Sequence, residues 1–177
     1  MVLRWIAVLA TALLLAGATP DVFAQVVYTT TLSGAAAVPP NASTAVGSAT
    51  ITYVPATSMM TVSMSFSGLS GIATAAHIHC CTSTTTNVGV ATSTSGFTGF
   101  PTGATSGTYQ HTFDMTLASS FNPAFVTASG GIAAARQRLL DGMGNRTAYL
   151  DIHTAPFPGG ELRGNLVEQS LFRNGFD

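Results

Sequence analysis

A strict alternation of apolar and hydroxylic residues is the feature that most constrains how this chain folds. From Met60 to Phe66, every even position is apolar and every odd position is Ser or Thr. Successive side chains of a β-strand point to opposite faces of a sheet, so the pattern predicts a strand with one buried and one solvated face. Such strands are typical of antiparallel sheets, because one face packs on the core while the other meets water.

Comparable patterns along the chain predict about seven strands in an all-β fold. We expect strands at residues 26–32, 49–53, 60–66, 72–79, 109–117, 147–154 and 161–167. Short strands separated by Gly- and Pro-rich turns are typical of an antiparallel β-sandwich. One short helix is expected near residues 130–141, because apolar residues recur there at helical spacing and Gly142 follows as a stop signal. The inward positions form the predicted core: Met60, Val62, Met64, Phe66, Phe113, Met115, Leu117, Leu150, Ile152, Leu162 and Leu166.

Charged residues are scarce in this sequence. They make up 7% of the 177 residues, against roughly 25% in an average soluble domain, and none lies from Val22 to Phe113. The net charge is −1 and the chain has no Lys, which argues against a nucleic-acid partner because phosphate binding needs clustered basic residues. The 26 Thr residues provide hydroxyls instead, as expected of a secreted domain with solvated strand faces.

The N-terminal segment is typical of a secretory signal peptide. Arg4 precedes an apolar stretch at residues 6–18, which is shorter than the roughly 20 residues that a membrane-spanning helix needs. The sequence Val-Phe-Ala then stands directly before Gln25, as at a cleavage site. We therefore expect residues 1–24 to be removed and the protein to be secreted, to the extracellular space or the periplasm, without a membrane anchor. An uncleaved N-terminal anchor is the alternative.

Several motifs of the chain match those of one extracellular domain family. The longest covers residues 148–154 and 157–164 and follows the closing signature Y-x-N-I-H-T…F-P-G-G-E-I-R-G. Shorter matches lie at residues 39–40, 47, 66–69 and 76–79. On these motifs the chain resembles the CHRD (chordin-type) domain, in particular a bacterial secreted subgroup. We expect one such domain at residues 25–168, followed by a short C-terminal tail at 169–177.

The resemblance implies an extracellular, immunoglobulin-like β-sandwich, but it implies no activity and no catalytic residue. The expected partner is an extracellular protein or matrix component of unknown identity. Asp151 departs from the family pattern, which has Asn there, and it adds a negative charge beside His153. The closing signature contributes these structural residues: Tyr149, Asp151, Thr154, Gly159, Gly160, Glu161, Arg163 and Gly164.

Strand parity predicts that three of the four histidines share one face. Ile78 is the natural inward residue of its strand, so His77 and His79 should both point outward. In the later strand of the closing signature, Asp151 and His153 also fall on the outer face. If the two strands are neighbours, these side chains form one polar patch.

Two further polar residues and the fourth histidine follow from the same parity. Glu161 and Arg163 flank the inward Leu162, so they should extend the outer patch and pair with each other as ions. His111 has the parity of Phe113, so we expect it at or near the core and apart from the other histidines.

Two interpretations of His77, His79 and His153 are open at this point. Two imidazoles on one strand and a third from a neighbour make a trio that can bind copper or zinc. Alternatively, each ring hydrogen-bonds to nearby protein groups and holds a loop in place. The two differ in geometry, because metal ligands must converge on one point.

Cys80 and Cys81 directly follow the His-x-His segment, and three interpretations of them are open. Export to an oxidising compartment favours a disulfide between these neighbours, although adjacent residues are poorly placed for one. Alternatively, the two thiolates lie near the histidines and add metal ligands, or each sulfur bridges to another chain.

The sequence contains no constellation that predicts catalysis. It has no Gly-x-Ser-x-Gly motif, no Lys for a phosphate-binding loop, and no carboxylate from Val22 to Phe113 for acid–base chemistry. We therefore expect a secreted, non-enzymatic binding or matrix-type domain of unknown ligand. The alternative is an extracytoplasmic metal-binding protein that uses copper or zinc on its His-x-His strand, with or without redox activity.

Overall fold

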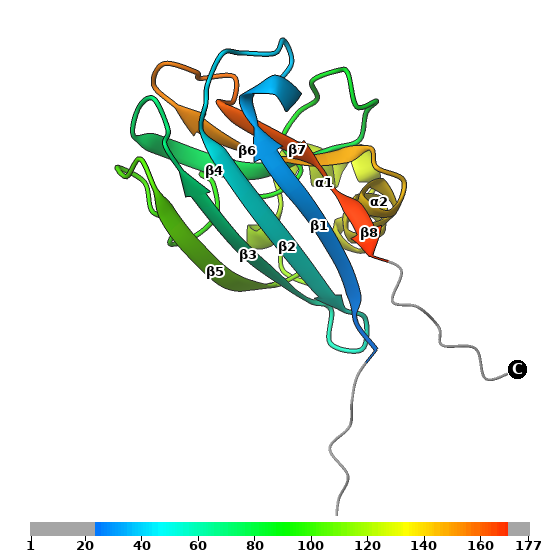
Figure 1. Cartoon of the computed structure of the whole chain (residues 1–177). Helices are drawn as coiled ribbons and strands as arrows, with labels where there is room; N and C mark the ends of the chain where they lie inside the picture. Colours follow the sequence, from blue (N-terminus) through cyan, green and yellow to red (C-terminus); the bar gives the residue numbers. More distant parts are fainter. Residues whose placement is uncertain (1–23, 170–177) are drawn as a thin grey trace, which may run out of the picture.

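The computed structural model describes residues 24–169, which form a curled antiparallel sheet with two helices (Figure 1). The elements are β1 (Val26–Ser33), β2 (Val46–Val54), β3 (Met59–Ser67), β4 (Ala73–Cys80), β5 (Gly107–Asp114), α1 (Pro123–Ser129), α2 (Ile132–Gly144), β6 (Ala148–Thr154), β7 (Leu162–Asn165) and β8 (Val167–Gln169). Short 3-10 turns lie at Gly34–Ala36 and Ala118–Ser120. The expected signal peptide and C-terminal tail lie almost wholly outside the described residues.

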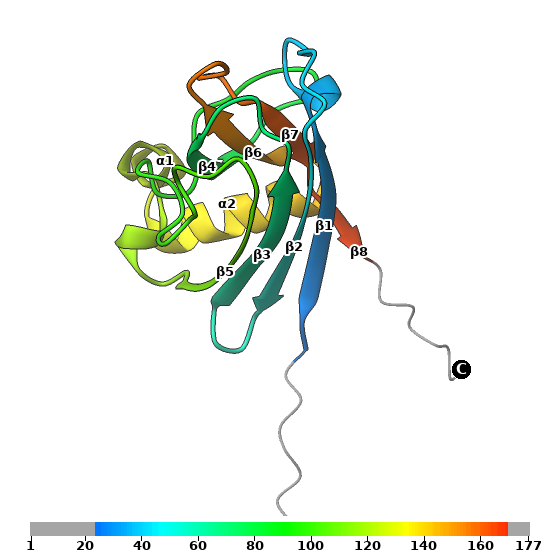
Figure 2. The same cartoon turned by 60° about the vertical axis from the view of Figure 1, so that its left-hand side comes forward.

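All eight strands belong to one sheet, in the order β4-β6-β7-β1-β2-β3-β5, with β8 also paired to β1. Every pairing is antiparallel. Figure 2 shows α2 running across one side of the curled sheet. The all-β fold class is thus confirmed, whereas a sandwich of two separate sheets is not.

The predicted parity of β3 is confirmed. Met60, Val62, Met64 and Phe66 are buried, and the hydroxylic residues between them lie on the outer face. Strands β2 and β5 flank β3 in matching register, so their inward residues complete the same apolar layer. The sequence pattern therefore fixes which face of this part of the sheet meets the core.

The predicted strand at residues 109–117 is too long, and the prediction that Leu117 is buried is wrong. Strand β5 ends at Asp114, and Leu117 is 52% exposed. The Asp114 carboxylate accepts hydrogen bonds from both the backbone N–H and the hydroxyl of Thr116, at 2.8 and 2.6 Å. Asp side chains commonly bond to backbone groups two residues on, and the turn that results here ends the strand pairing.

The predicted helix is confirmed as α2, although it continues past Gly142, the expected stop, to Gly144. The helix α1 was not predicted. Asn122 caps α1 by accepting a hydrogen bond from the backbone N–H of Ala124 at 2.9 Å, and Pro123 occupies the first helical turn. Gly130 ends α1 in the left-handed conformation, with φ at 90°. With only seven residues, α1 is too short to show a clear helical period in the sequence.

The segment 161–167 was predicted as one strand, and it forms two. Strand β7 pairs with β6 and touches β1, while β8 pairs with β1 alone. Gly164 lies so close to the backbone oxygen of Thr31 that a Cβ atom would overlap it. The closing signature therefore needs glycine at this position. Within residues 24–169, no helix is long and apolar enough to cross a membrane.

Candidate metal centre

The neighbouring strands β4 and β6 carry the candidate site. Their register sets His77 opposite Asp151 and Ala75 opposite His153. His79 lies two residues beyond His77 and therefore on the same face. We refer to His77, His79, Asp151 and His153 as the His/Asp cluster.

Apolar residues on the opposite face fix the direction of these side chains. Ile78, Leu150 and Ile152 alternate with the cluster residues and have no exposed surface. A slip of either strand by one residue would exchange apolar and polar faces, so core packing holds the cluster in register.

Asp151 lies at the centre of the cluster. Its Oδ2 is 3.1 Å from His79 Nε2, and its Oδ1 is 3.1 Å from His153 Nε2. The ring centroid of His77 lies 5.1 Å from that of His153 and 5.8 Å from that of His79. One potential ligand atom from each of the four residues lies within 4.8 Å of all the others.

The outer nitrogen of each histidine donates to a backbone carbonyl. The bonds are His77 Nε2 to Thr94 O at 3.3 Å, His79 Nδ1 to Val88 O at 2.6 Å and His153 Nδ1 to Pro158 O at 2.9 Å. A carbonyl oxygen only accepts, so each of these nitrogens carries the ring hydrogen. In a neutral ring, the other nitrogen then presents a lone pair to the cluster.

Four buried atoms of the cluster have no hydrogen-bond partner. They are His77 Nδ1, His79 Nε2, His153 Nε2 and Asp151 Oδ1. With neutral rings, all four are acceptors, and two acceptor–acceptor contacts with Asp151 are only 3.1 Å long. Buried polar atoms normally find partners, so this arrangement calls for a positive charge, a proton or a metal ion, between the acceptors.

The protonation states respond to burial and to Asp151. Burial disfavours ionisation of Asp151, but contacts with His153 and His79 outweigh this effect and hold its pKa below the ordinary value. Burial also disfavours a charged His153, yet Asp151 raises the pKa of that ring above its ordinary value. Burial lowers the pKa of His77 despite the nearby carboxylate, so His77 is neutral at pH 7, the state in which imidazole binds metal.

The face on which the cluster lies is covered by a loop. His77 and His79 are only 7% and 8% exposed, and Asp151 only 2%. The carbonyls of Val88 and Thr94 belong to the connection between β4 and β5, residues 81–106, which lies over this face. Sequence parity thus placed the histidines correctly together on the outer side, but it missed the loop that encloses them.

The predicted ion pair of Glu161 and Arg163 is not formed. The Glu161 carboxylate accepts from the Ser43 and Thr154 hydroxyls, both at 2.6 Å, and from the Ser70 backbone N–H at 2.8 Å. Arg163 donates instead to the loop that covers the cluster. Each residue is fully buried and engages a different segment, because different loops fold over their common face.

Cys80 and Cys81 are joined by a disulfide, which corrects their assignment as candidate metal ligands. Metal ligation needs a free thiolate, and neither sulfur is free. Both sulfurs also lie against the carbonyl of Arg138 on α2, away from the histidines. His111 is separate as well, since its ring packs between Tyr109 and Phe113 on β5.

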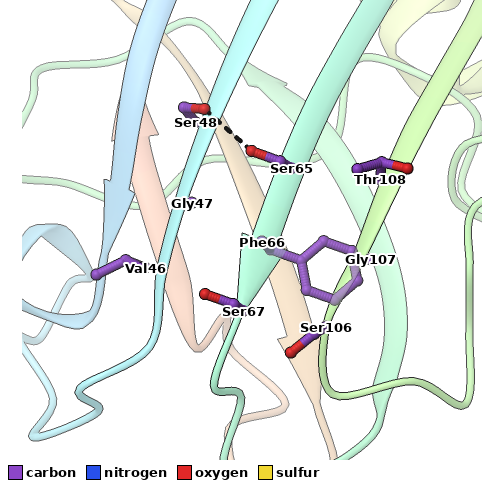
Figure 3. Close-up of a pocket in the computed structure, with 9 residues that line it drawn as sticks. All are labelled: Val46, Gly47, Ser48, Ser65, Phe66, Ser67, Ser106, Gly107 and Thr108. Atoms are coloured by element: carbon purple, nitrogen blue, oxygen red, sulfur yellow. Dashed lines mark hydrogen bonds between the residues drawn. The ribbon is translucent and has the colours of Figure 1, made fainter.

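A surface groove lies apart from the candidate site. It lies over β2, β3 and β5 and is lined mostly by Gly, Ser and Thr residues, with Val46 and Phe66 beside them (Figure 3). The hydroxyls of Ser48 and Ser65 form a hydrogen bond of 3.2 Å across its floor. The groove contains no titratable side chain, so it offers no acid–base or metal chemistry.

The fold and the site define an all-β domain with a cluster of three histidines and one aspartate, of which only His153 is partly exposed. The family model for the CHRD domain matches residues 28–166, and the chain therefore belongs to the CHRD domain family. This confirms the family that the closing signature indicated. Searches of curated proteins and of solved structures find no match.

The other signature residues mostly support the cluster and its surroundings. Thr154 bonds Glu161, and Tyr149 stacks on His79 with a centroid distance of 4.7 Å. Gly160 has a φ of 110° and passes close to Asp151, whereas Gly159 has open space around it.

Sequence reasoning placed Asp151 in the patch but did not count it as a ligand. It expected the rings to hydrogen-bond to nearby protein groups, but it did not identify the carbonyls of Val88, Thr94 and Pro158. Backbone acceptors leave no signal in side-chain patterns, so only the fold could reveal them.

Proposed function

We propose that this CHRD domain is a metal-binding domain whose His/Asp cluster holds one zinc or copper ion. The observation that carries the proposal is the set of four buried, unpartnered acceptor atoms contributed by the cluster. Nitrogen and oxygen atoms that converge without donors between them form a site for a cation.

The ligand set agrees best with zinc in a structural role. Zinc takes four ligands in a tetrahedron, and nitrogen and oxygen ligands lie about 2.0–2.2 Å from it, which sets them about 3.4 Å apart. The cluster atoms lie within 4.8 Å of one another, so small side-chain movements close the difference. Three imidazoles also suit copper. With four protein ligands, the ion has no open position of the kind that catalytic zinc sites keep.

The outer hydrogen bonds support the same function. Metal-bound histidines almost always donate their other ring nitrogen to a carbonyl or carboxylate, which fixes the ring and its tautomer. All three rings of the cluster have such a partner. A bound ion would therefore join β4, β6 and the loops that supply these carbonyls into one unit.

The test is a metal titration of the exported protein after removal of bound metal with a chelator. Zinc and copper are each added in competition with a chromophoric chelator. We expect one ion per chain and a loss of affinity in H77A, H79A and H153A. The matched control is H111N, which removes a histidine outside the cluster and should bind like the wild type. Equal binding by H153A and the wild type would refute the proposal.

A second candidate function rests on the outer face of β1, β2, β3 and β5. Hydroxylic residues of neighbouring strands stand opposite one another there, as in the row Thr31, Ser48, Ser65 and Thr108. No charged residue occurs from Val22 to Phe113, so this face fits a neutral partner. This supports a non-enzymatic extracellular binding or matrix-type domain. A pull-down from the organism's secreted fraction tests this function, with the wild type and S65R as baits. We expect the wild type to capture a partner and S65R to capture none.

A further inference from the structure

We propose that Arg163 is a positioning residue for the metal centre: through the covering loop and Tyr149, it holds the His79 ring in the orientation and tautomer that ligation needs. The inference rests on the proposed metal function. Arg163 lies on β7, directly opposite Asp151 on β6, and is 2% exposed. It does not belong to the His/Asp cluster itself.

All three hydrogen bonds of the Arg163 guanidinium go to one short segment of the covering loop. Nη1 donates to Asn87 Oδ1 at 2.8 Å, and Nη2 donates to the carbonyls of Thr84 and Thr86 at 3.2 and 3.0 Å. A planar guanidinium offers donors in a fixed fork, so one side chain fixes three points of this segment. The segment ends directly before Val88, whose carbonyl accepts the His79 Nδ1 hydrogen.

Arg163 is also connected to His79 through a stack of three planar groups: the guanidinium, the Tyr149 ring and the His79 ring. The Arg163 Cζ lies 3.6 Å from the centroid of the Tyr149 ring, and this ring lies parallel to His79, at 4.7 Å and 6°. The Tyr149 hydroxyl also bonds both backbone groups of Val88, at 3.2 and 3.3 Å. Arg163, Tyr149 and Val88 thus hold the ring plane and the outer nitrogen of His79 together.

The consequence concerns the lone pair of His79 Nε2. While Val88 accepts from Nδ1, the neutral ring must present Nε2 to the cluster without a hydrogen. If the loop is released, the ring can turn and the hydrogen can move to Nε2, which blocks ligation. Loss of an outer partner of a metal-bound histidine typically lowers metal affinity by about 10–100-fold.

The experiment compares the full exported protein with R163M and with the milder Y149F. Y149F keeps the stacked ring but removes the hydroxyl bonds to Val88. Three quantities are measured: zinc affinity by competition, the visible absorption of the cobalt-substituted protein, and the His79 tautomer by nitrogen NMR of the metal-free protein. We expect about 10–100-fold weaker zinc binding in R163M, and the same direction in Y149F. Both variants should show weaker cobalt bands and a new Nε2–H form of His79.

Two controls separate positioning from general stability. R138M removes another arginine that lies over an aromatic ring, at 5.0 Å from the centroid of Phe125, but its guanidinium makes no hydrogen bond to the covering loop. I51A removes core packing in β2, which does not pair with β4 or β6, and should lower the melting temperature. Both should keep the zinc affinity, the cobalt spectrum and the His79 tautomer of the wild type.

The outcomes distinguish this inference from the proposed function. Wild-type zinc affinity and an unchanged His79 tautomer in R163M and Y149F would overturn the inference and leave the metal site standing. An affinity loss in I51A equal to that in R163M would also overturn it, since stability alone would then explain the effect. A wild-type protein that binds neither metal would overturn the proposed function itself.

Discussion

Asp151 is the residue at which the structural and metal-binding interpretations differ most clearly. Its carboxylate is buried between two imidazole nitrogens that carry no hydrogen in the neutral rings. Asp151 raises the pKa of His153, so below that pKa a ring proton lies between the two groups and the pair is favourable. Above that pKa the proton is lost, and an asparagine amide could then donate to one of those nitrogens, whereas the carboxylate cannot. Without metal, the wild-type arrangement is therefore unfavourable for folding only above the pKa of His153.

We predict opposite effects of D151N on stability and on metal binding. In urea unfolding at a pH above the raised pKa of His153, the metal-free variant should be at least as stable as the wild type. Its zinc affinity should fall on the order of 100-fold, since structural sites of four ligands bind with about 10–16 kcal/mol and one ligand is weakened. Strong destabilisation with unchanged zinc affinity would show that Asp151 has a structural role only.

Glu161 leads to a prediction about acid stability. Burial disfavours its ionisation, but hydrogen bonds from Ser43, Thr154 and Ser70 outweigh this and hold its pKa below the ordinary 4.5. A lowered pKa in the folded state adds stability above the unfolded-state pKa, and this contribution is lost as the pH falls through the folded-state value.

E161Q should therefore lower the free energy of unfolding by about 1.5–3 kcal/mol at pH 7. It should also lose less stability than the wild type as the pH falls below about 4.5. Urea unfolding of metal-free protein from pH 7 to pH 3 measures both effects. The control is E168Q, which changes an exposed carboxylate and should follow the wild-type curve. If the free energy of unfolding falls equally with pH in E161Q and the wild type, the lowered pKa of Glu161 would be contradicted.

Helix α2 packs directly against the disulfide of Cys80 and Cys81, and this contact leads to a further prediction. Gly142 lies in α2, and a Cβ there would overlap Cys80 Sγ and lie 2.8 Å from Cys81 Sγ. Replacing an interior helical glycine by alanine normally gains about 0.8–1.0 kcal/mol. Forcing extra atoms into a packed contact typically costs about 1–3 kcal/mol.

We expect G142A to lower stability despite its better helix propensity. The matched control is G144A, where the new Cβ meets only the flexible Glu168 carboxylate at 3.3 Å, so its stability should not fall. Thermal unfolding of both variants under oxidising conditions is the measurement. A stabilised G142A would mean that α2 does not press on the disulfide.

The same elements show what the sequence can and cannot predict. The alternation in β3, β4 and β6 gives strand faces directly, and with them the common side of the three cluster histidines. Strand order gives no local signal, so the single curled sheet could not be distinguished from two packed sheets. The loop at residues 81–106 has no periodicity, which is why the burial of the cluster and its carbonyl partners could not be foreseen.

At the scale of the whole molecule, we propose that the protein is secreted. The support is the signal-peptide pattern before Gln25, together with a disulfide of the kind found in oxidising compartments. N-terminal sequencing of the exported protein should therefore begin at Gln25. An exported product that still carries Trp5 would contradict cleavage.

We propose that the three histidines and Asp151 bind one metal ion between β4 and β6. Anomalous diffraction at the zinc edge, from crystals of the exported protein grown with equimolar zinc, tests it most directly. We expect one strong peak about 2.0–2.2 Å from His77 Nδ1, His79 Nε2, His153 Nε2 and an oxygen of Asp151. The proposal would be contradicted by a cluster without a peak in which the three inner nitrogens take other hydrogen-bond partners.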